Sequence, residues 1–109
     1  MLPNQFFKML SDETRLRCLI LVARENSVSV GDLSVALEQS QPKISRHLAI
    51  LRQSGVLLDK REGQWVYYQV NSELPGWMRK VIDGLIASNC LKKEYQLDIN
   101  NYQSIKKDA

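Results

Sequence analysis

The segment Ser40–Gly55 combines side chains whose chemistry suits the recognition of nucleic-acid bases. It reads SQPKISRHLAILRQSG. At helical spacing Ser45 and Arg46 lie on the outward arc, and Gln41 lies at the N-terminus, the end that a recognition helix inserts into the major groove. A glutamine amide can bond adenine through two atoms, an arginine can fork onto guanine, and a serine hydroxyl can bond several bases. We therefore expect these three side chains to contact base edges in a major groove.

Other residues of the same segment are suited to phosphate groups. We expect Lys43 and the backbone N–H groups near Ser40 to bind phosphates, because lysines and helix N-termini commonly hold them. His47 points nearer to the side of the helix that must be buried. Its position favours packing or a phosphate contact over a titrating switch, which a reference pKa of about 6.5 would also permit.

The distribution of charge supports the same chemistry. Residues 39–65 carry five Lys or Arg against two Asp or Glu, which equals the net charge of +3 of the 109-residue chain. A solvated surface would explain this surplus as well as a nucleic acid would, so the surrounding elements must decide. We expect Lys60, Arg61 and Gln64 to hold the flanking backbone or the minor groove from the tip of a hairpin.

The elements expected around this helix are those of a winged helix-turn-helix, mainly helical with a β-hairpin wing. Ser29 begins a short helix, and an EQS turn leads to the recognition-like helix, which Ser40 caps. The β-rich segments Leu57–Lys60 and Gln64–Val70 then flank a turn in which Gly63 supplies a positive φ. The buried stripe of the recognition-like helix is expected to be Ile44, Leu48 and Leu51.

Helices on both sides of this unit are more apolar than so small a core requires. The first carries an apolar stripe from Phe6 to Leu10, and the last begins near Pro75. We expect both to pair with a second copy, giving a homodimer whose recognition helices meet two half-sites. Residues 1–91 are thus predicted to form the winged helix-turn-helix domain with its dimerisation helices. Residues 92–109 are predicted to form a polar tail that is either a frayed helix or disordered.

Several classes of protein are disfavoured by the sequence. The longest apolar run, Cys18 to Ala23, is too short to cross a membrane and no secretion signal is visible, so we expect a cytoplasmic protein. An enzyme is disfavoured because the chain has one histidine, no glycine-rich phosphate loop and no recognisable nucleophile–base motif. The alternative is a winged-helix module that binds a protein, against which the charge surplus and the outward Gln41 and Arg46 argue.

The motifs DETRLR, SQPKISRHL, GQWVYYQV and ELPGW resemble the ArsR/SmtB family of bacterial repressors, and most of all its arsenic-responsive members. The resemblance covers about residues 4 to 88. It implies a homodimeric repressor that binds an operator near its own promoter and leaves it when an inducer binds. It also implies that the regulated genes serve detoxification, as they commonly do for the arsenic-type members.

The inducer site of the best-known arsenic sensors is missing from this sequence. Those sensors carry a Cys-x-Cys-x-x-Cys pattern at the start of the third helix, where this chain has Ser29, Gly31 and Ser34. Trivalent arsenic prefers thiolates, whereas hydroxyls stay protonated at neutral pH. We expect Ser29 to be an N-cap and Ser34 to be solvated. The zinc site of other members is also unsupported, because the last helix has Asp83 but no histidine, and we expect no metal.

Cys18 and Cys90 are the two thiols left for sensing. They are expected on the second and last helices, each at the margin of the apolar stripe of its helix. Because these helices could face each other, the pair could bind a trivalent arsenical, close a disulfide or trap a persulfide. Some family members sense reactive sulfur through a cysteine pair on these same helices. Buried unreactive cysteine is also common in proteins. A sensing pair, a structural role, and a repressor with no metalloid response therefore all stay open.

Overall fold

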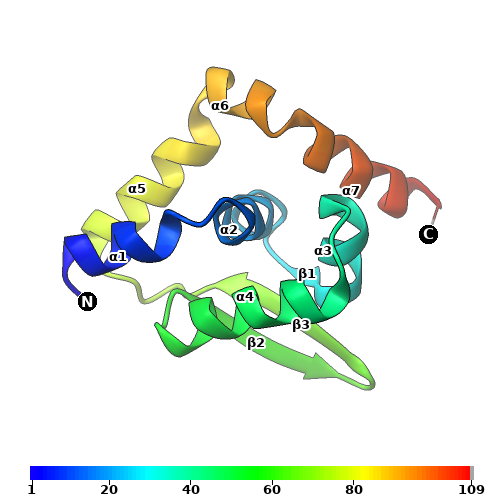
Figure 1. The fold of residues 1–109 in the computed structure, drawn as a ribbon, viewed down its shortest axis with the longest axis horizontal. Helices are drawn as coiled ribbons and strands as arrows, with labels where there is room; N and C mark the ends of the chain where they lie inside the picture. The colour runs from blue at the N-terminus through cyan, green and yellow to red at the C-terminus, as the bar shows by residue number, and fades with distance from the viewer. Residues whose placement is uncertain (109) are drawn as a thin grey trace.

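A computed structural model describes residues 1–108, and the order of their elements is that of a winged helix-turn-helix with a helical C-terminal extension. The helix α2 runs through the middle of the molecule, α4 and the hairpin lie on one side of it, and α5 to α7 arch over the other (Figure 1). The elements are α1 (Pro3–Leu10), α2 (Glu13–Glu25), β1 (Val28–Ser29), α3 (Val30–Leu37), α4 (Gln41–Gln53), β2 (Leu57–Glu62), β3 (Trp65–Val70), α5 (Gly76–Ala87), α6 (Asn89–Glu94) and α7 (Gln96–Asp108).

Side-chain caps begin the three helices that build the helix-turn-helix. Asp12, Ser29 and Ser40 each accept a hydrogen bond from the backbone N–H three residues later, at 3.0, 3.1 and 3.4 Å. Such a cap satisfies one of the N–H groups that a helix leaves without a partner at its start. The caps expected at Ser29 and Ser40 are confirmed.

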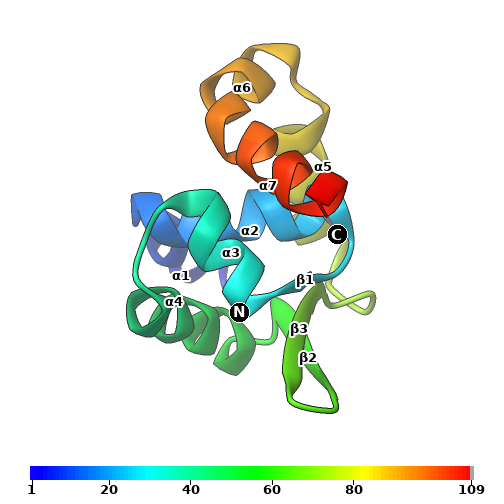
Figure 2. The ribbon, with the colours of Figure 1, turned by 90° about the vertical axis from the view of Figure 1, so that its right-hand side faces the viewer.

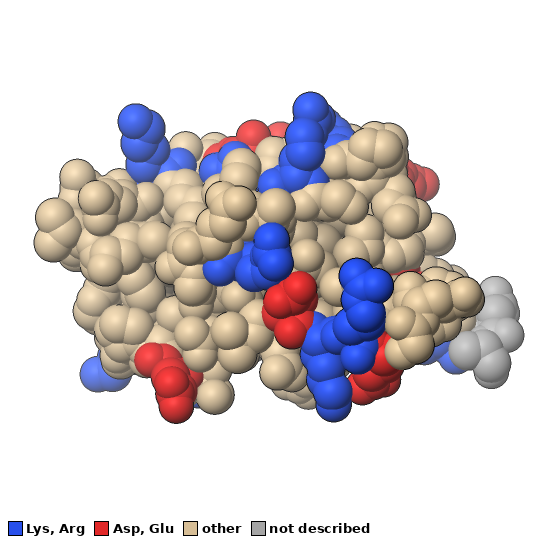
Figure 3. All heavy atoms as spheres, turned by 90° about the horizontal axis from the view of Figure 1, so that it is seen from below, with Lys and Arg blue, Asp and Glu red and all other residues tan. Residues whose placement is uncertain are grey.

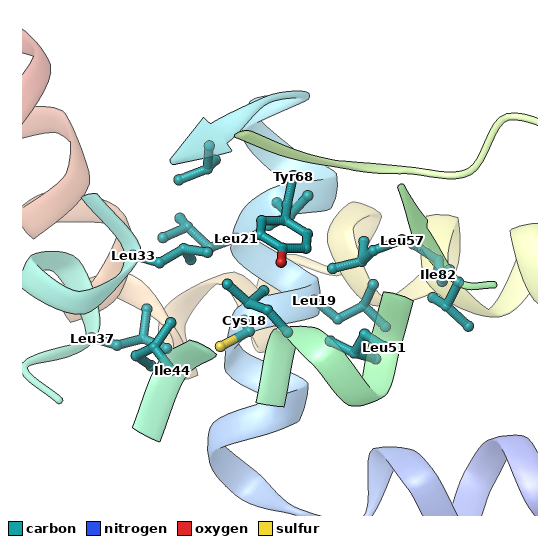
Figure 4. Packing of buried hydrophobic residues seen from close by; sticks show 14 of the residues in the cluster. Cys18, Leu19, Leu21, Leu33, Leu37, Ile44, Leu51, Leu57, Tyr68 and Ile82 are labelled. Atoms are coloured by element: carbon teal, nitrogen blue, oxygen red, sulfur yellow. The ribbon is translucent and has the colours of Figure 1, made fainter. Parts of the chain in front are cut away.

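The core lies where α4 and α3 pack against α2. The expected stripe of α4, Ile44, Leu48 and Leu51, is fully buried, as are Leu19 and Leu33. Figure 4 shows Leu19, Leu33, Ile44 and Leu51 gathered with Tyr68 and Leu57 of the sheet around α2. Interdigitated packing of this kind resists displacement, so α4 is held in one orientation relative to α2.

The three strands form one antiparallel sheet in the order β1-β3-β2. The pairing of β2 with β3 runs from Leu57 opposite Val70 to Glu62 opposite Trp65. Gly63, in the connecting turn, has a φ of 63°, which a side chain would make unfavourable. The hairpin projects from the helices as a wing (Figure 2), and the predicted fold class is confirmed.

The C-terminal segment differs from its prediction. The last predicted helix is divided into α5 and α6 by Ser88, whose ψ of 122° is not helical. Because α6 runs from Asn89 to Glu94, it crosses residue 91, where the domain was predicted to end. Residues 92–108 are not a frayed or disordered tail, because α7 is helical and buries Ile99 and Tyr102. The apolar residues Tyr95, Ile99 and Tyr102 recur at helical spacing within a polar stretch, a weak signal of one buried face. Residue 109 lies outside the described residues.

The helices expected to pair with a second copy lie together at one edge of the molecule. Phe6 of α1 packs edge-to-face on Trp77 of α5, with ring centroids 5.3 Å apart, while the neighbouring Phe7 is 52% exposed.

In the part of the chain that the structure describes, every helix is too short or too polar to cross a membrane.

Candidate nucleic-acid interface

The three side chains predicted to contact bases lie on the exposed side of α4. Gln41, Ser45 and Arg46 are all exposed, whereas Ile44 and Leu48 of the same helix are completely enclosed by the core. The buried stripe therefore fixes which face of α4 the solvent meets. Because Gln41 is the first residue of the helix, its amide stands at the end that this motif inserts into a groove.

A groove of about 330 Å³ joins this helix end to the wing. Its lining includes Gln41 and Ser45 of α4, Gln64 and Trp65 of the wing, and Gly31 near the start of α3. Three elements that are separate in sequence thus bring polar and aromatic side chains to one surface. The structure brings the predicted Gln64 together with the predicted residues of α4.

The basic side chains on this side of the molecule form separate groups. Figure 3 shows Lys and Arg in several clusters, with acidic groups beside some of them. Lys60 lies 3.3 Å from Glu62, and the Nζ of Lys43 donates to the side-chain oxygen of Gln39 at 3.0 Å. Exposed ion pairs contribute about 0–1 kcal/mol, so a phosphate can replace such a partner at little cost.

Arg46 and Arg61 are exposed and form no ion pair with the residues of the described range, 1–108. Ser40, whose hydroxyl caps α4, is exposed as well. The first turn of α4 contains no acidic residue, so nothing in it opposes an approaching phosphate. Arg46 is therefore available to a base edge, and Ser40 and Arg61 are available to a nucleic-acid backbone.

His47 lies toward α2 rather than on the exposed arc. Its side chain is 13% exposed, and its Nε2 is 3.7 Å from the carboxylate of Asp12 at the start of α2. Burial lowers the pKa of His47, and the nearby Asp12 opposes this shift. The sequence prediction that His47 faces the buried side agrees with this position, which makes it a link between α4 and α2.

Trp65 is a candidate that the sequence analysis missed. It is 53% exposed at the start of β3, whereas Tyr68 on the other face of the strand is buried. The period of two along a strand could have identified it, since Trp65 and Tyr68 must lie on opposite faces. An exposed indole beside Gln64 offers a flat apolar surface to a sugar or a base.

The start of α3 holds no thiol ligands, and its serines are engaged in the fold. Ser29 is buried as the N-cap of α3, as predicted. The prediction that Ser34 is solvated is wrong, because its hydroxyl donates to the backbone oxygen of Gln39 at 2.6 Å and closes the turn before α4. Within residues 1–108, no group of three or more His, Cys, Asp or Glu is arranged to hold a metal ion.

The two cysteines are not brought together within one chain. Cys18 is completely buried, and Figure 4 shows its sulfur near Ile44 and Leu37. Burial raises the pKa of this thiol to about 12, so it is neutral at physiological pH. Cys90 is exposed on α6, beyond the break at Ser88. The expectation that both lie at the margins of facing helices is wrong for this chain.

Comparisons with known proteins agree with this geometry. The profile of the family described as "Bacterial regulatory protein, arsR family" matches residues 12–57. Over 101 residues, the chain is 48% identical to the arsenical resistance operon repressor of Escherichia coli, covering 93% of this chain and 85% of that protein. It is 52% identical over 87 residues to an arsenic resistance transcriptional regulator of Pseudomonas putida, covering 80% of this chain and 76% of that protein. Among solved structures, reduced HlyU from Vibrio cholerae matches with a TM-score of 0.68 and 35% identity, over 78% of this chain and 85% of that chain.

Proposed function

Because the chain belongs to the arsR family of DNA-binding transcriptional regulators, we propose that it represses transcription as a homodimer bound to an operator, from which an inducer releases it. Family membership also confirms that the protein is a regulator rather than an enzyme.

The observation that carries the proposal is the exposed arc of α4 beside the wing. Gln41, Ser45 and Arg46 contact base edges, because they are exposed on the helix whose other face is fixed in the core. The backbone contacts come from four further positions that surround this arc, and Gln64 joins them from the groove. Those positions are Ser40, Lys43, Lys60 and Arg61.

The test uses a duplex that the wild-type chain selects from a random-sequence library, called the selected duplex below. Gln41→Ala and Arg46→Ala each weaken binding to it by about 1–3 kcal/mol, as expected for loss of one base contact. Gln53→Ala is the matched control, because Gln53 is an exposed glutamine at the far end of the same helix. A gel-shift titration in which all three variants bind like wild type would refute the proposal. Failure of the wild type to select any duplex would favour a protein-interaction module.

The homodimer is supported by the apolar surface of α1. Phe7 is half-exposed next to the Phe6–Trp77 contact that joins α1 to α5, and a monomer gains nothing from displaying it. Phe7→Glu converts the dimer to monomers in sedimentation and weakens binding to the selected duplex. Asn4→Glu, which introduces the same charge at an exposed position of α1, does neither. Equal sedimentation of both variants and wild type as dimers would place the interface elsewhere.

The inducer is proposed to be an arsenical or another thiol-reactive compound. Two relatives named for arsenic or arsenical resistance support this, and Cys90 is the thiol that solvent reaches. Cys18 is assigned a packing role because it is completely buried in the core. Release of the selected duplex by arsenite, methylarsenite and polysulfide is compared in wild type and Cys90→Ser. Unchanged release in the variant removes Cys90 from the response, and no release of wild type by any of the three supports a repressor without a metalloid response.

A further inference from the structure

Arg17 of α2 and Asp98 of α7 form a largely buried ion pair. The Nε and Nη2 of Arg17 donate to the two carboxylate oxygens of Asp98 at 2.9 and 2.7 Å. The two side chains are 17% and 8% exposed. A bidentate pair of this kind fixes the relative orientation of its two partners. It therefore ties α7 to α2 in one position.

The same guanidinium reaches the C-terminal end of α3. Arg17 Nη2 donates to the backbone oxygen of Leu37 at 3.0 Å, and the Nδ2 of Asn101 on α7 donates to that of Ala36 at 2.9 Å. The last carbonyls of a helix lack partners within the helix and need donors from elsewhere. Arg17 and Asn101 supply two of these donors, and a cation is favourable at this end of the helix dipole.

The capped carbonyls directly precede the turn of the helix-turn-helix. Only residues 38–40 separate α3 from α4. Within this turn the backbone N–H groups of Glu38 and Gln39 donate to Val35 and Ser34 at 3.2 Å each, so both are already committed to α3. Glu38 also takes a left-handed φ of 56°, which leaves the turn little freedom. A displacement of the end of α3 is consequently passed on to the start of α4.

Further contacts extend along the same interface. Figure 1 shows α7 beside α3, and α7 buries Ile99 and Tyr102 there and in the adjoining core. Lys106 lies 3.6 Å from the Asp32 carboxylate near the start of α3. Hence α7 spans both ends of α3, the first helix of the DNA-reading motif.

We propose that Arg17, Asp98 and Asn101 are positioning residues for DNA recognition, through which α7 fixes the end of α3 and hence the angle at which α4 meets the duplex. The inference rests on the proposed DNA binding. It assigns a role in recognition to α7, which lies outside residues 12–57 that match the family profile. Base contacts depend on that angle, whereas phosphate contacts tolerate small displacements, so the three residues act on specificity more than on total affinity.

The test compares Asn101→Ala with Asn100→Ala. Both replace an asparagine of α7, but Asn100 is exposed, and its side chain accepts a hydrogen bond from Gln96 on its own helix. Each variant is titrated with the selected duplex and with a scrambled duplex of the same length and composition. Asn101→Ala binds the selected duplex about tenfold more weakly, the effect of one lost buried hydrogen bond. Its affinity for the scrambled duplex and its salt dependence match wild type, and Asn100→Ala matches wild type in every measurement.

A second measurement uses reciprocity between α7 and the duplex. If α7 docking favours the DNA-binding orientation of α4, then bound DNA must favour α7 docking by the same factor. Hydrogen exchange of the α7 amides in wild type therefore slows when the selected duplex binds, and this slowing is smaller in Asn101→Ala. Equal affinities of the two variants, or equal losses on both duplexes, would overturn the inference. If wild type selects no duplex, the proposed function itself fails, which is a separate and recognisable result.

Discussion

The helices α4 and α7 pack against the same helix, α3, and both bury apolar residues, but polar contacts contribute more to the attachment of α7. The helix α4 buries an apolar stripe of Ile44, Leu48 and Leu51. The helix α7 adds polar contacts at both ends of α3, through Asn101 and Lys106. Apolar stripes leave a periodic pattern in the sequence, whereas polar contacts between distant residues leave none. The comparison explains why α4 could be predicted from the sequence and α7 could not.

The largest expected effect comes from the apolar stripe of α4. Leu48→Ala lowers the free energy of unfolding by about 2–5 kcal/mol, because it leaves a cavity at a fully enclosed site. Ile50→Ala on the same helix is the control, since Ile50 is exposed and its truncation costs less than about 1 kcal/mol. Urea denaturation followed by circular dichroism measures both values. Equal losses in the two variants would show that the stripe does not hold α4.

The next effect concerns the polar attachment of α7. Asp98→Ala leaves the Arg17 guanidinium without its partner and lowers the free energy of unfolding by about 2–3 kcal/mol, less than for a fully buried pair because some water reaches the site. Glu94→Ala removes an equivalent charge from an exposed position on α6 and changes stability little. Urea denaturation again provides the measurement. A loss in Asp98→Ala no greater than in Glu94→Ala would mean that the ion pair contributes no net stability.

The reactivity of Cys18 tests whether a reagent can reach the apolar core beneath α4. Iodoacetamide at pH 8 modifies Cys90 in the folded chain and leaves Cys18 intact, because Cys18 is fully buried and its pKa is raised to about 12. Mass spectrometry of the digested protein measures the two sites separately. Modification of Cys18 at the rate of Cys90 would show that α4 opens readily from α2 and would revive a sensing role for this thiol.

The raised pKa of the same thiol predicts that the stability of the protein depends on pH. The pKa of Cys18 is raised from 9.0 in the unfolded chain to about 12 in the folded one, so the folded state favours the neutral thiol. Its contribution to stability is complete below pH 9 and is lost as the pH rises toward 12. Between these values, the free energy of unfolding of wild type falls more steeply than that of Cys18→Ala. Parallel curves would contradict the burial of the thiol.

The helix-turn-helix and the wing could be predicted from the sequence because the residues that determine them lie close together in the chain. The caps at Ser29 and Ser40 lie three residues from the N–H groups they bind, and Gly63 lies within the turn that needs it. The exposed arc of α4 followed directly from the buried stripe. Nothing local marks Arg17 as the partner of Asp98, which is 81 residues away, or Asn101 as the partner of Ala36, 65 residues away.

The misassigned side chains have the same origin. Ser34 was expected in solvent because its partner, the backbone oxygen of Gln39, becomes available only when the turn closes. Cys18 was expected at the margin of its helix because α2 is covered on several sides, by α3, α4, α5 and the sheet, and a single apolar stripe does not describe such a helix. Tertiary packing decides both positions.

The smallest effect comes from the polar link of α4 itself, between His47 and Asp12. Burial lowers the pKa of His47 below its unfolded value of 6.5, so the folded state favours the neutral ring. This contribution to stability is complete above pH 6.5 and is lost as the pH falls through the folded-state pKa. The Asp12 pKa is also lowered, chiefly by the hydrogen bond from the Arg15 N–H, and adds a further loss in more acidic solution.

His47→Gln, which cannot be protonated, therefore loses less stability than wild type between pH 6.5 and 5, as urea denaturation across this range measures. Because α4 depends mainly on its apolar stripe, the difference is small beside that of Leu48→Ala. The opposite result, in which wild type loses less stability than His47→Gln, would mean that an ion pair between protonated His47 and Asp12 anchors α4.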